Sequence, residues 1–263
     1  MQFDYYIGID YSGRGEPNRR TTGIQVVEMD RDGQVKRISP DGSQGRTFSW
    51  SRRNVYDYLK NRLSVQKHKM IIGIDHCLSF PIAYFEQQGL KNWDEFLNHF
   101  QALWNTKEEM VRVCKDRVDS YPNQTELRLT ETFTASAKSA WNFEQKTGTV
   151  AYSTHAGLPW IYELRRLFRD DLHIWPYDGW NPGSEKSVLA EIYPSLLYKR
   201  FRQFDADFPL DWPRDAQDAY VVATWLRERT LNETIERYFE VSTLTGEEKQ
   251  LALQYEGWIL GVC

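Results

Sequence analysis

Two acidic residues stand at the ends of two similar apolar segments. The segment FDYYIGID ends at Asp10 and the segment KMIIGID ends at Asp75. Apolar runs of this length rich in Ile and Tyr are typical of buried strands, so each places a carboxylate where a strand leaves the core. Open α/β sheets bind ligands at that edge. Either Asp alone is more simply explained as the start of a turn, but with the later acids the pair indicates a metal site.

Two later segments contribute further acids. Residues 188–192 are predicted to form a strand with Glu191 near its end, where it could also be an ordinary solvated residue. In DWPRDAQDAYVVATW, Pro213 suits the start of a helix on which Asp215 and Asp218 share a face. Asp218 aligns with the apolar stripe of this helix, where an unpaired charge is costly unless it is neutralised, paired or bound to metal. Asp215 has a simpler explanation, because acids in the first helical turn interact favourably with the helix dipole.

These acids form one candidate site. Hard carboxylate oxygens suit Mg²⁺ or Mn²⁺, which bind a few carboxylates and keep positions for water and phosphate oxygens. The expected metal ligands are Asp10, Asp75, Asp215 and Asp218, and the expected catalytic carboxylates are Asp10, Asp75, Glu191 and Asp218.

The elements that must position these acids follow from hydrophobic periodicity and turn residues. An Asp-Gly turn at residues 30–33 predicts a hairpin that continues the first strand as an antiparallel meander. Ser51 can cap a helix with apolar residues at four-residue spacing, and the strand that ends at Asp75 follows. A helix is expected from Pro159 to residue 168, and DLHIWPY then predicts a short strand. This order predicts a mixed sheet in which the two acid strands are neighbours.

The middle of the chain is predicted to be a mostly helical insertion. It covers about residues 81–155 within a single domain of residues 1–263. Asn92 can cap one of its helices, and Thr106 begins a sequence with the spacing of a capping box. Residues 119–154 show no pattern that assigns them to a helix or a strand.

Composition predicts a globular protein of the cytoplasm. Hydrophobic residues make up 41% and charged residues 27% of the chain. No apolar stretch approaches membrane-spanning length, and the first residues lack the basic and apolar regions of a signal peptide. The uneven spacing of Cys77, Cys114 and Cys263 fits neither a disulfide framework nor a zinc site.

Charge limits the kind of nucleic-acid binding that is expected. A net charge of −4 argues against non-specific coating of nucleic acid, which depends on many contacts between phosphates and Lys or Arg. It does not exclude an enzyme that holds nucleic acid locally. The loop that follows Asp10 is the best candidate for such contacts, and its basic residues are Arg14, Arg19 and Arg20.

Several short motifs together resemble a known family. GIDYSG, IDHCLSFP, AEIYPS, DAQDAYVVA and EGWILGV are similar to the family called domain of unknown function 429, whose members are described as predicted nucleases of the RNase H-like superfamily. The resemblance implies a mixed five-stranded sheet flanked by helices and a two-metal mechanism. It also implies that Asp10 is the first-strand ligand, Asp75 the fourth-strand acid, and Asp218 or Asp215 the acid of the final helix. Holliday-junction resolvases, whose terminal helix the DAQDAYVVA segment also resembles, have Glu where this chain has Asp75, and their minimal set has no counterpart of Glu191.

The leading hypothesis is a metal-dependent nuclease or phosphodiesterase acting on nucleic acid or another phosphate ester. Two ions about 4 Å apart, bridged by Asp10, would activate a water and stabilise the leaving oxygen. No nucleophile elbow, HEXXH or P-loop motif competes with this mechanism, and His76 and His155 are candidate proton carriers. A binding module without catalysis on the same fold is an alternative. An actin-like Mg-ATP phosphotransferase is another, although the segment after Asp75 lacks the Gly-rich turn of those proteins.

Overall fold

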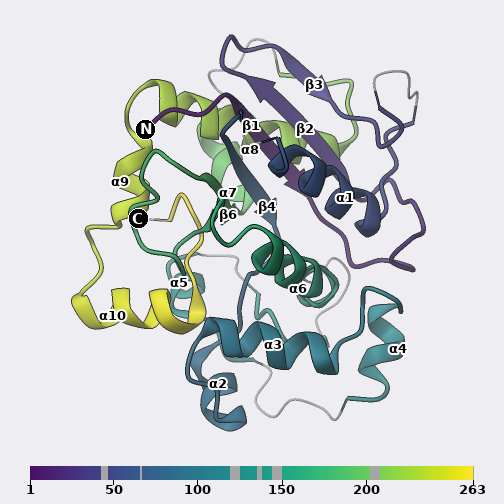
Figure 1. Cartoon of the computed structure of the whole chain (residues 1–263), viewed down its shortest axis with the longest axis vertical. Helices are drawn as coiled ribbons and strands as arrows, with labels where there is room; N and C mark the ends of the chain where they lie inside the picture. The colour runs from purple at the N-terminus through teal and green to yellow at the C-terminus, as the bar shows by residue number, and fades with distance from the viewer. Residues whose placement is uncertain are drawn as a thin grey trace.

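A computed structural model of the chain describes residues 1–42, 47–65, 67–118, 125–134, 138–143, 150–201 and 208–262. The described residues form a six-stranded mixed sheet in the order β3-β2-β1-β4-β6-β5 (Figure 1). Its strands are β1 (Tyr5–Asp10), β2 (Gln25–Asp30), β3 (Val35–Arg37), β4 (Met70–Asp75), β5 (Leu172–Ile174) and β6 (Ser187–Glu191). Strand β1 is antiparallel to β2 and parallel to β4, and β6 is parallel to both of its neighbours.

The sheet confirms that the two acid strands are neighbours, but it has six strands where five were expected. The additional strand is β5, which comes from the DLHIWPY segment and pairs with β6 at the edge of the sheet. A short strand was predicted there, and its addition to this sheet accounts for the difference.

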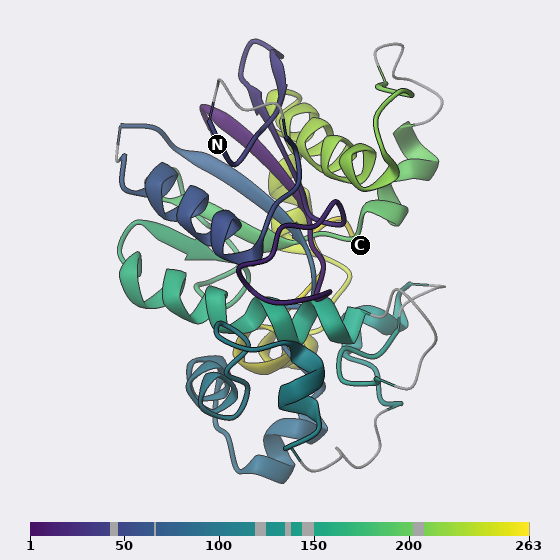
Figure 2. The same cartoon turned by 90° about the vertical axis from the view of Figure 1, so that its right-hand side faces the viewer.

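Helices cover both faces of the sheet. Helices α1 (Arg52–Leu63) and α6 (Val150–Leu167) pack on one face, and α8 (Arg214–Leu231) packs on the other (Figure 2). The insertion contributes the helices α2 (Ile82–Gln88), α3 (Trp93–Leu103), α4 (Val111–Lys115) and α5 (Leu129–Thr132), of which α2, α3 and α4 lie beyond α6 in Figure 1. The remaining elements are α7 (Pro194–Phe201), α9 (Ile235–Glu240), α10 (Gly246–Leu251) and a π-helical turn (Ala252–Glu256). No helix in the described ranges has both the length and the apolar character needed to cross a lipid bilayer.

Two glycines allow α8 to pack directly on the backbone of the sheet. Gly8 of β1 and Gly73 of β4 are partners in the strand register. A Cβ on Gly8 would lie 1.9 Å from the carbonyl oxygen of Ala219, and a Cβ on Gly73 would lie 2.5 Å from Cγ1 of Val222. The Gly-Ile-Asp repeat therefore has a structural cause: the glycine admits the helix, and the acid two residues later projects from the same face.

Helix α6 begins at Val150, earlier than predicted, and contains Pro159 in its interior. Proline has no N–H to donate to the carbonyl of His155, one turn back. The Thr106 hydroxyl donates a hydrogen bond to that carbonyl instead, at 2.7 Å. Two predictions were therefore wrong. The helix does not start at Pro159, because the Thr106 hydroxyl satisfies the carbonyl that a proline inside the helix leaves free. Thr106 does not cap a helix, and the next helix starts at Val111.

The caps of two other helices agree with the sequence predictions. Ser51 accepts a hydrogen bond from the Asn54 N–H at the start of α1, and Asn92 accepts one from the Glu95 N–H at the start of α3. Parts of the unassigned stretch, residues 119–124, 135–137 and 144–149, lie outside the described residues, as does the last cysteine.

Candidate active site

Asp10 and Asp75 lie side by side at the carboxyl-terminal edge of the sheet. They are direct partners in the register of β1 and β4. Each follows by two residues a glycine against which α8 packs, so both side chains project from the α8 face. Both are half-buried and line a cavity of about 830 Å³. The sequence predicted two carboxylates at the ends of neighbouring strands, and the structure places them side by side at one edge of the sheet.

Burial and mutual repulsion raise the pKa of both carboxyls. Burial is the largest cause for Asp10, followed by the negative charge of Asp75, and its pKa lies well above the ordinary value. Burial, then the charges of Asp218 and Glu191, raise the pKa of Asp75 to about 8. A hydrogen bond joins the two carboxyls, so the pair shares a proton that it retains well above the ordinary pKa of an aspartate. The nearby ion pairs belong to Glu191 and Asp218, and none joins Asp10 or Asp75 to a described Lys or Arg.

The two acids of α8 lie on the same face but outside the cavity wall. Their charges raise the pKa of Asp10, which places them close to it. Among the described residues that line the cavity, however, neither Asp215 nor Asp218 occurs. The Oδ1 atom of Asp218 forms an ion pair with Nε of Arg214 at 3.1 Å. Burial raises the pKa of Asp215 and Asp218, and the Arg214 charge opposes that rise.

Glu191 lines the same cavity as Asp10 and Asp75, but its side chain belongs to the other face of the sheet. It pairs in register with Ile74, whose side chain lies in the core beneath α1 and α6. Arg128 donates two hydrogen bonds to the Glu191 carboxylate, at 2.6 and 2.8 Å, and the Leu78 N–H donates a third at 3.0 Å. A bidentate guanidinium already neutralises this carboxylate, so Glu191 is not available as a free metal ligand in this arrangement.

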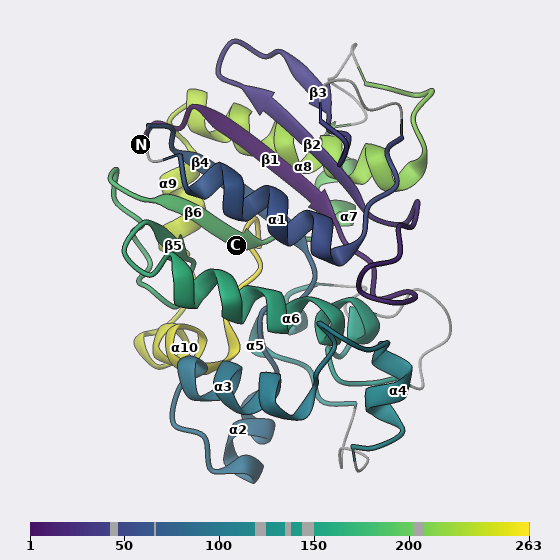
Figure 3. The same ribbon diagram turned by 45° about the vertical axis from the view of Figure 1, so that its right-hand side comes forward.

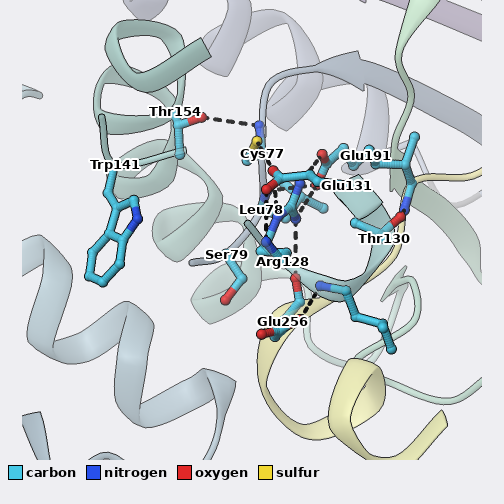
Figure 4. Close-up of polar contacts among 12 residues, drawn as sticks. Cys77, Leu78, Ser79, Arg128, Thr130, Glu131, Trp141, Thr154, Glu191 and Glu256 are labelled. Carbon is cyan, nitrogen blue, oxygen red and sulfur yellow. Dashed lines mark hydrogen bonds and ion pairs between the residues drawn. The ribbon is translucent and has the colours of Figure 1, made fainter. Parts of the chain in front are cut away.

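Arg128 is the centre of a buried polar network (Figure 4). Its side chain is fully buried, and its Nε and Nη1 atoms donate to Oε1 of Glu131 at 3.0 Å and to the backbone oxygen of Glu256 at 3.1 Å. The Glu256 carboxylate accepts hydrogen bonds from the N–H groups of Ile82 and Leu129, at 2.7 and 2.5 Å. The network joins the insertion and the C-terminal segment to β6. Arg128 lies in the stretch without a sequence pattern, so no local signal identified it.

The loop after β1 forms another wall of the cavity. Arg52 of α1 is buried, and its guanidinium donates to the carbonyl oxygens of Arg14 and Gly15 at 3.2 and 2.9 Å. Gly13 approaches α6 so closely that a Cβ there would lie 2.0 Å from the Tyr152 carbonyl oxygen. These contacts hold the loop between α1 and the start of α6 (Figure 3).

Only part of the expected substrate-binding arginine set lies at the cavity. Arg14 is exposed and lines it. Arg19 and Arg20 are absent from its described lining, and Arg20 forms an ion pair with Asp41, with Nη1 and Oδ2 at 2.8 Å. The arginines that directly follow Asp10 along the chain therefore do not gather in one place.

Two cations that sequence reasoning missed also line the cavity. Arg112 of α4 and Lys138 are both exposed. They are separated from Arg14 by about a hundred residues of chain, so no motif links the three. None of the three forms an ion pair with a residue that the structure describes. The insertion thus supplies part of the site, which the resemblance to a nuclease family did not indicate.

The two candidate histidines are neutral at physiological pH. His76 lines the cavity, and burial lowers its pKa to about 4. Its Nδ1–H donates to the Cys77 carbonyl at 2.9 Å, which fixes the tautomer. His155 is fully buried among aromatic rings outside the described cavity wall, and burial lowers its pKa to about 3. Neither histidine is therefore an imidazolium that could act as a general acid near pH 7.

A divalent ion fits the Asp10–Asp75 pair, whereas a site with three ligands is not preformed. Mg²⁺ binds proteins through one or two carboxylates and retains several waters. The two Asp side chains offer adjacent oxygen donors whose repulsion a cation would relieve. Within the described ranges, no group of three or more His, Cys, Asp or Glu side chains is arranged to hold a metal ion.

No protein-family model, no curated protein and no solved structure matches this chain. Its function must therefore be inferred from the residues of the site.

Proposed function

We propose that the protein is a divalent-metal-dependent hydrolase of phosphodiester bonds, a nuclease on an RNase H-like fold related to the family called domain of unknown function 429. The observation that carries this proposal is the pair of Asp10 and Asp75, two adjacent carboxyls without a described cationic partner in the wall of a cavity. The strand order and the antiparallel β2 support the fold assignment.

The paired acids would hold Mg²⁺ or Mn²⁺. Such an ion, when bound, makes water more acidic and neutralises charge on a phosphate. Asp10 and Asp75 release the proton that they share when both act as ligands, so metal affinity rises with pH. Arg14 lines the same cavity and is free to contact a phosphate oxygen, and Arg52 keeps its loop in place.

The other expected acids receive different proposed roles. Asp215 and Asp218 remain candidate contributors from the α8 face, because their charges act on Asp10. Glu191 is proposed to act as a positioning residue, since its carboxylate anchors Arg128.

Metal titration and cleavage assays test the proposal. Calorimetric titration with Mn²⁺ should show binding to the wild type and to the control Asp32→Asn, which changes an exposed acid in a distant turn, and no binding to Asp10→Asn or Asp75→Asn. Cleavage of single-stranded, duplex and branched DNA and RNA should require the metal and should be lost in both variants. Absence of binding at millimolar metal would overturn the proposal. Equal cleavage by wild type and Asp10→Asn would overturn it too, and binding without cleavage would favour a non-catalytic module.

A further inference from the structure

We infer that the cavity receives a single-stranded nucleic acid chain, with Arg14, Arg112 and Lys138 contacting its phosphates and Tyr152 contacting a base. All four residues line the cavity that contains the acid pair. The inference rests on the proposed function, which identifies the reacting bond as a phosphodiester. It adds that the substrate is single-stranded.

The size of the cavity favours a flexible strand over a duplex. Its volume of about 830 Å³ lies within the range of roughly 300–1,000 Å³ typical of pockets that enclose small molecules. A duplex would have to dock on the surface around such a cavity, because specific duplex complexes bury roughly 1,000–2,500 Å² of protein surface. The walls come from the loop after β1, from α4 and from the first turn of α6, which lie around the same edge of the sheet (Figure 3). Because Asp10 and Asp75 are part of this wall, a phosphodiester must enter the cavity to reach them.

The charges of the cavity favour a chain over a mononucleotide. The carboxylates of Glu131 and Glu191 are paired with Arg128 and do not compete for the cavity cations. Arg14, Arg112 and Lys138 come from three separate segments and form no ion pair with any described residue. Because the three cations lie on three separate walls, they are suited to contact several phosphates of a chain and not the single phosphate of a mononucleotide.

The apolar part of the lining suits a base. Tyr152 and Tyr193 are half-buried, and Val111 and Val150 lie in the same wall. The Tyr152 ring packs edge to face against Phe143 at a centroid distance of 5.0 Å, and this contact fixes the orientation of the ring. Proteins that bind single strands combine cationic tracks with aromatic side chains on which bases stack.

Fluorescence anisotropy in EDTA tests this inference without relying on cleavage. The probes are a labelled strand of about a dozen nucleotides, as DNA and as RNA, and the same strand in a blunt duplex, which should bind at least about tenfold more weakly. Three phosphate contacts give a slope of log affinity against log salt of about −2, since each contact in a single strand contributes about 0.7. Arg112→Gln should reduce the slope by about 0.7, whereas Lys36→Gln, an exposed lysine on the distant strand β3, should leave it unchanged. Tyr152→Leu should weaken binding at least about fivefold and Tyr152→Phe should restore it.

Three results of the binding experiments would overturn the inference. They are duplex binding as tight as single-strand binding, competition by adenosine monophosphate as strong as that by the unlabelled strand, and an unchanged salt slope in Arg112→Gln. Cleavage assays distinguish failure of this inference from failure of the proposed function. Asp10-dependent cleavage of duplex and single strand at equal rates would refute the inference alone, whereas single-strand binding without Asp10-dependent cleavage would refute the proposed function alone.

Discussion

Replacing Asp75 by Asn should make the metal-free protein more stable at neutral and higher pH. The pKa of Asp75 is about 8 in the folded protein, against an ordinary value of 3.8. Between these values the folded protein binds a proton that the unfolded chain has released. The stability from this group is therefore complete below about pH 4 and is lost progressively as the pH rises toward 8.

The magnitude follows from the size of the pKa shift. Each pH unit within the window costs about 1.4 kcal/mol, so the wild type has lost up to about 4 kcal/mol by pH 7. Asparagine does not titrate, and its amide can still form a hydrogen bond with the Asp10 carboxyl. We expect the free energy of unfolding of Asp75→Asn to exceed that of the wild type by an amount that grows with pH and reaches up to about 4 kcal/mol at pH 7.

Urea unfolding in EDTA at several pH values measures the effect. The quantity to compare is the difference between Asp75→Asn and wild type at about pH 5 and about pH 8, because titrating groups that do not interact with Asp75 cancel in that difference. Asp32→Asn, an exposed acid outside the cavity, should show no such trend. Millimolar Mg²⁺ should stabilise the wild type and not Asp75→Asn. A difference that does not change with pH, or a loss of stability in Asp75→Asn at pH 8, would refute the reasoning.

Three further substitutions test other parts of the structure by urea unfolding. Gly8→Ala places a Cβ against a backbone carbonyl of α8 and should lower the free energy of unfolding by about 3 kcal/mol or more. In the control Gly23→Ala the nearest contact would be 3.5 Å, and the loss should be under about 1 kcal/mol. Equal losses would contradict the packing argument. Glu191→Gln should cost about 3–5 kcal/mol, because it leaves the buried charge of Arg128 without its bidentate partner; a neutral effect would show that the pair is dispensable. Arg52→Gln should cost about 1–3 kcal/mol, since two loop carbonyls lose their donor; an unchanged free energy of unfolding would argue against this role.

The acid strands were predictable because their signals are local. An apolar run that ends in Gly-Ile-Asp specifies both a buried strand and a carboxylate at its end, and the same motif in β1 and β4 places Asp10 opposite Asp75. Helix α8 was predictable for the same reason, since Pro213 marks its start and its apolar stripe is periodic.

The rest depends on contacts between residues far apart in the chain. The side of the sheet on which Glu191 lies is set by its register with Ile74, and a shift of one residue reverses it. The ion pair of Glu191 with Arg128 spans 63 residues, and the bond that lets Pro159 sit inside α6 spans 49. Hydrophobic periodicity contains no information about such partners.

The contact of α8 with Gly8 and Gly73 makes the site vulnerable to changes that leave all of its acids intact. Any side chain at either glycine would act as a spacer between helix and sheet. Asp215 and Asp218 would then be carried away from Asp10 as a rigid unit, although every carboxylate would still be present. A related chain could thus retain every acid and still lose the contribution of Asp215 and Asp218 to the site, so the presence of these two glycines is as informative about that contribution as the acids themselves.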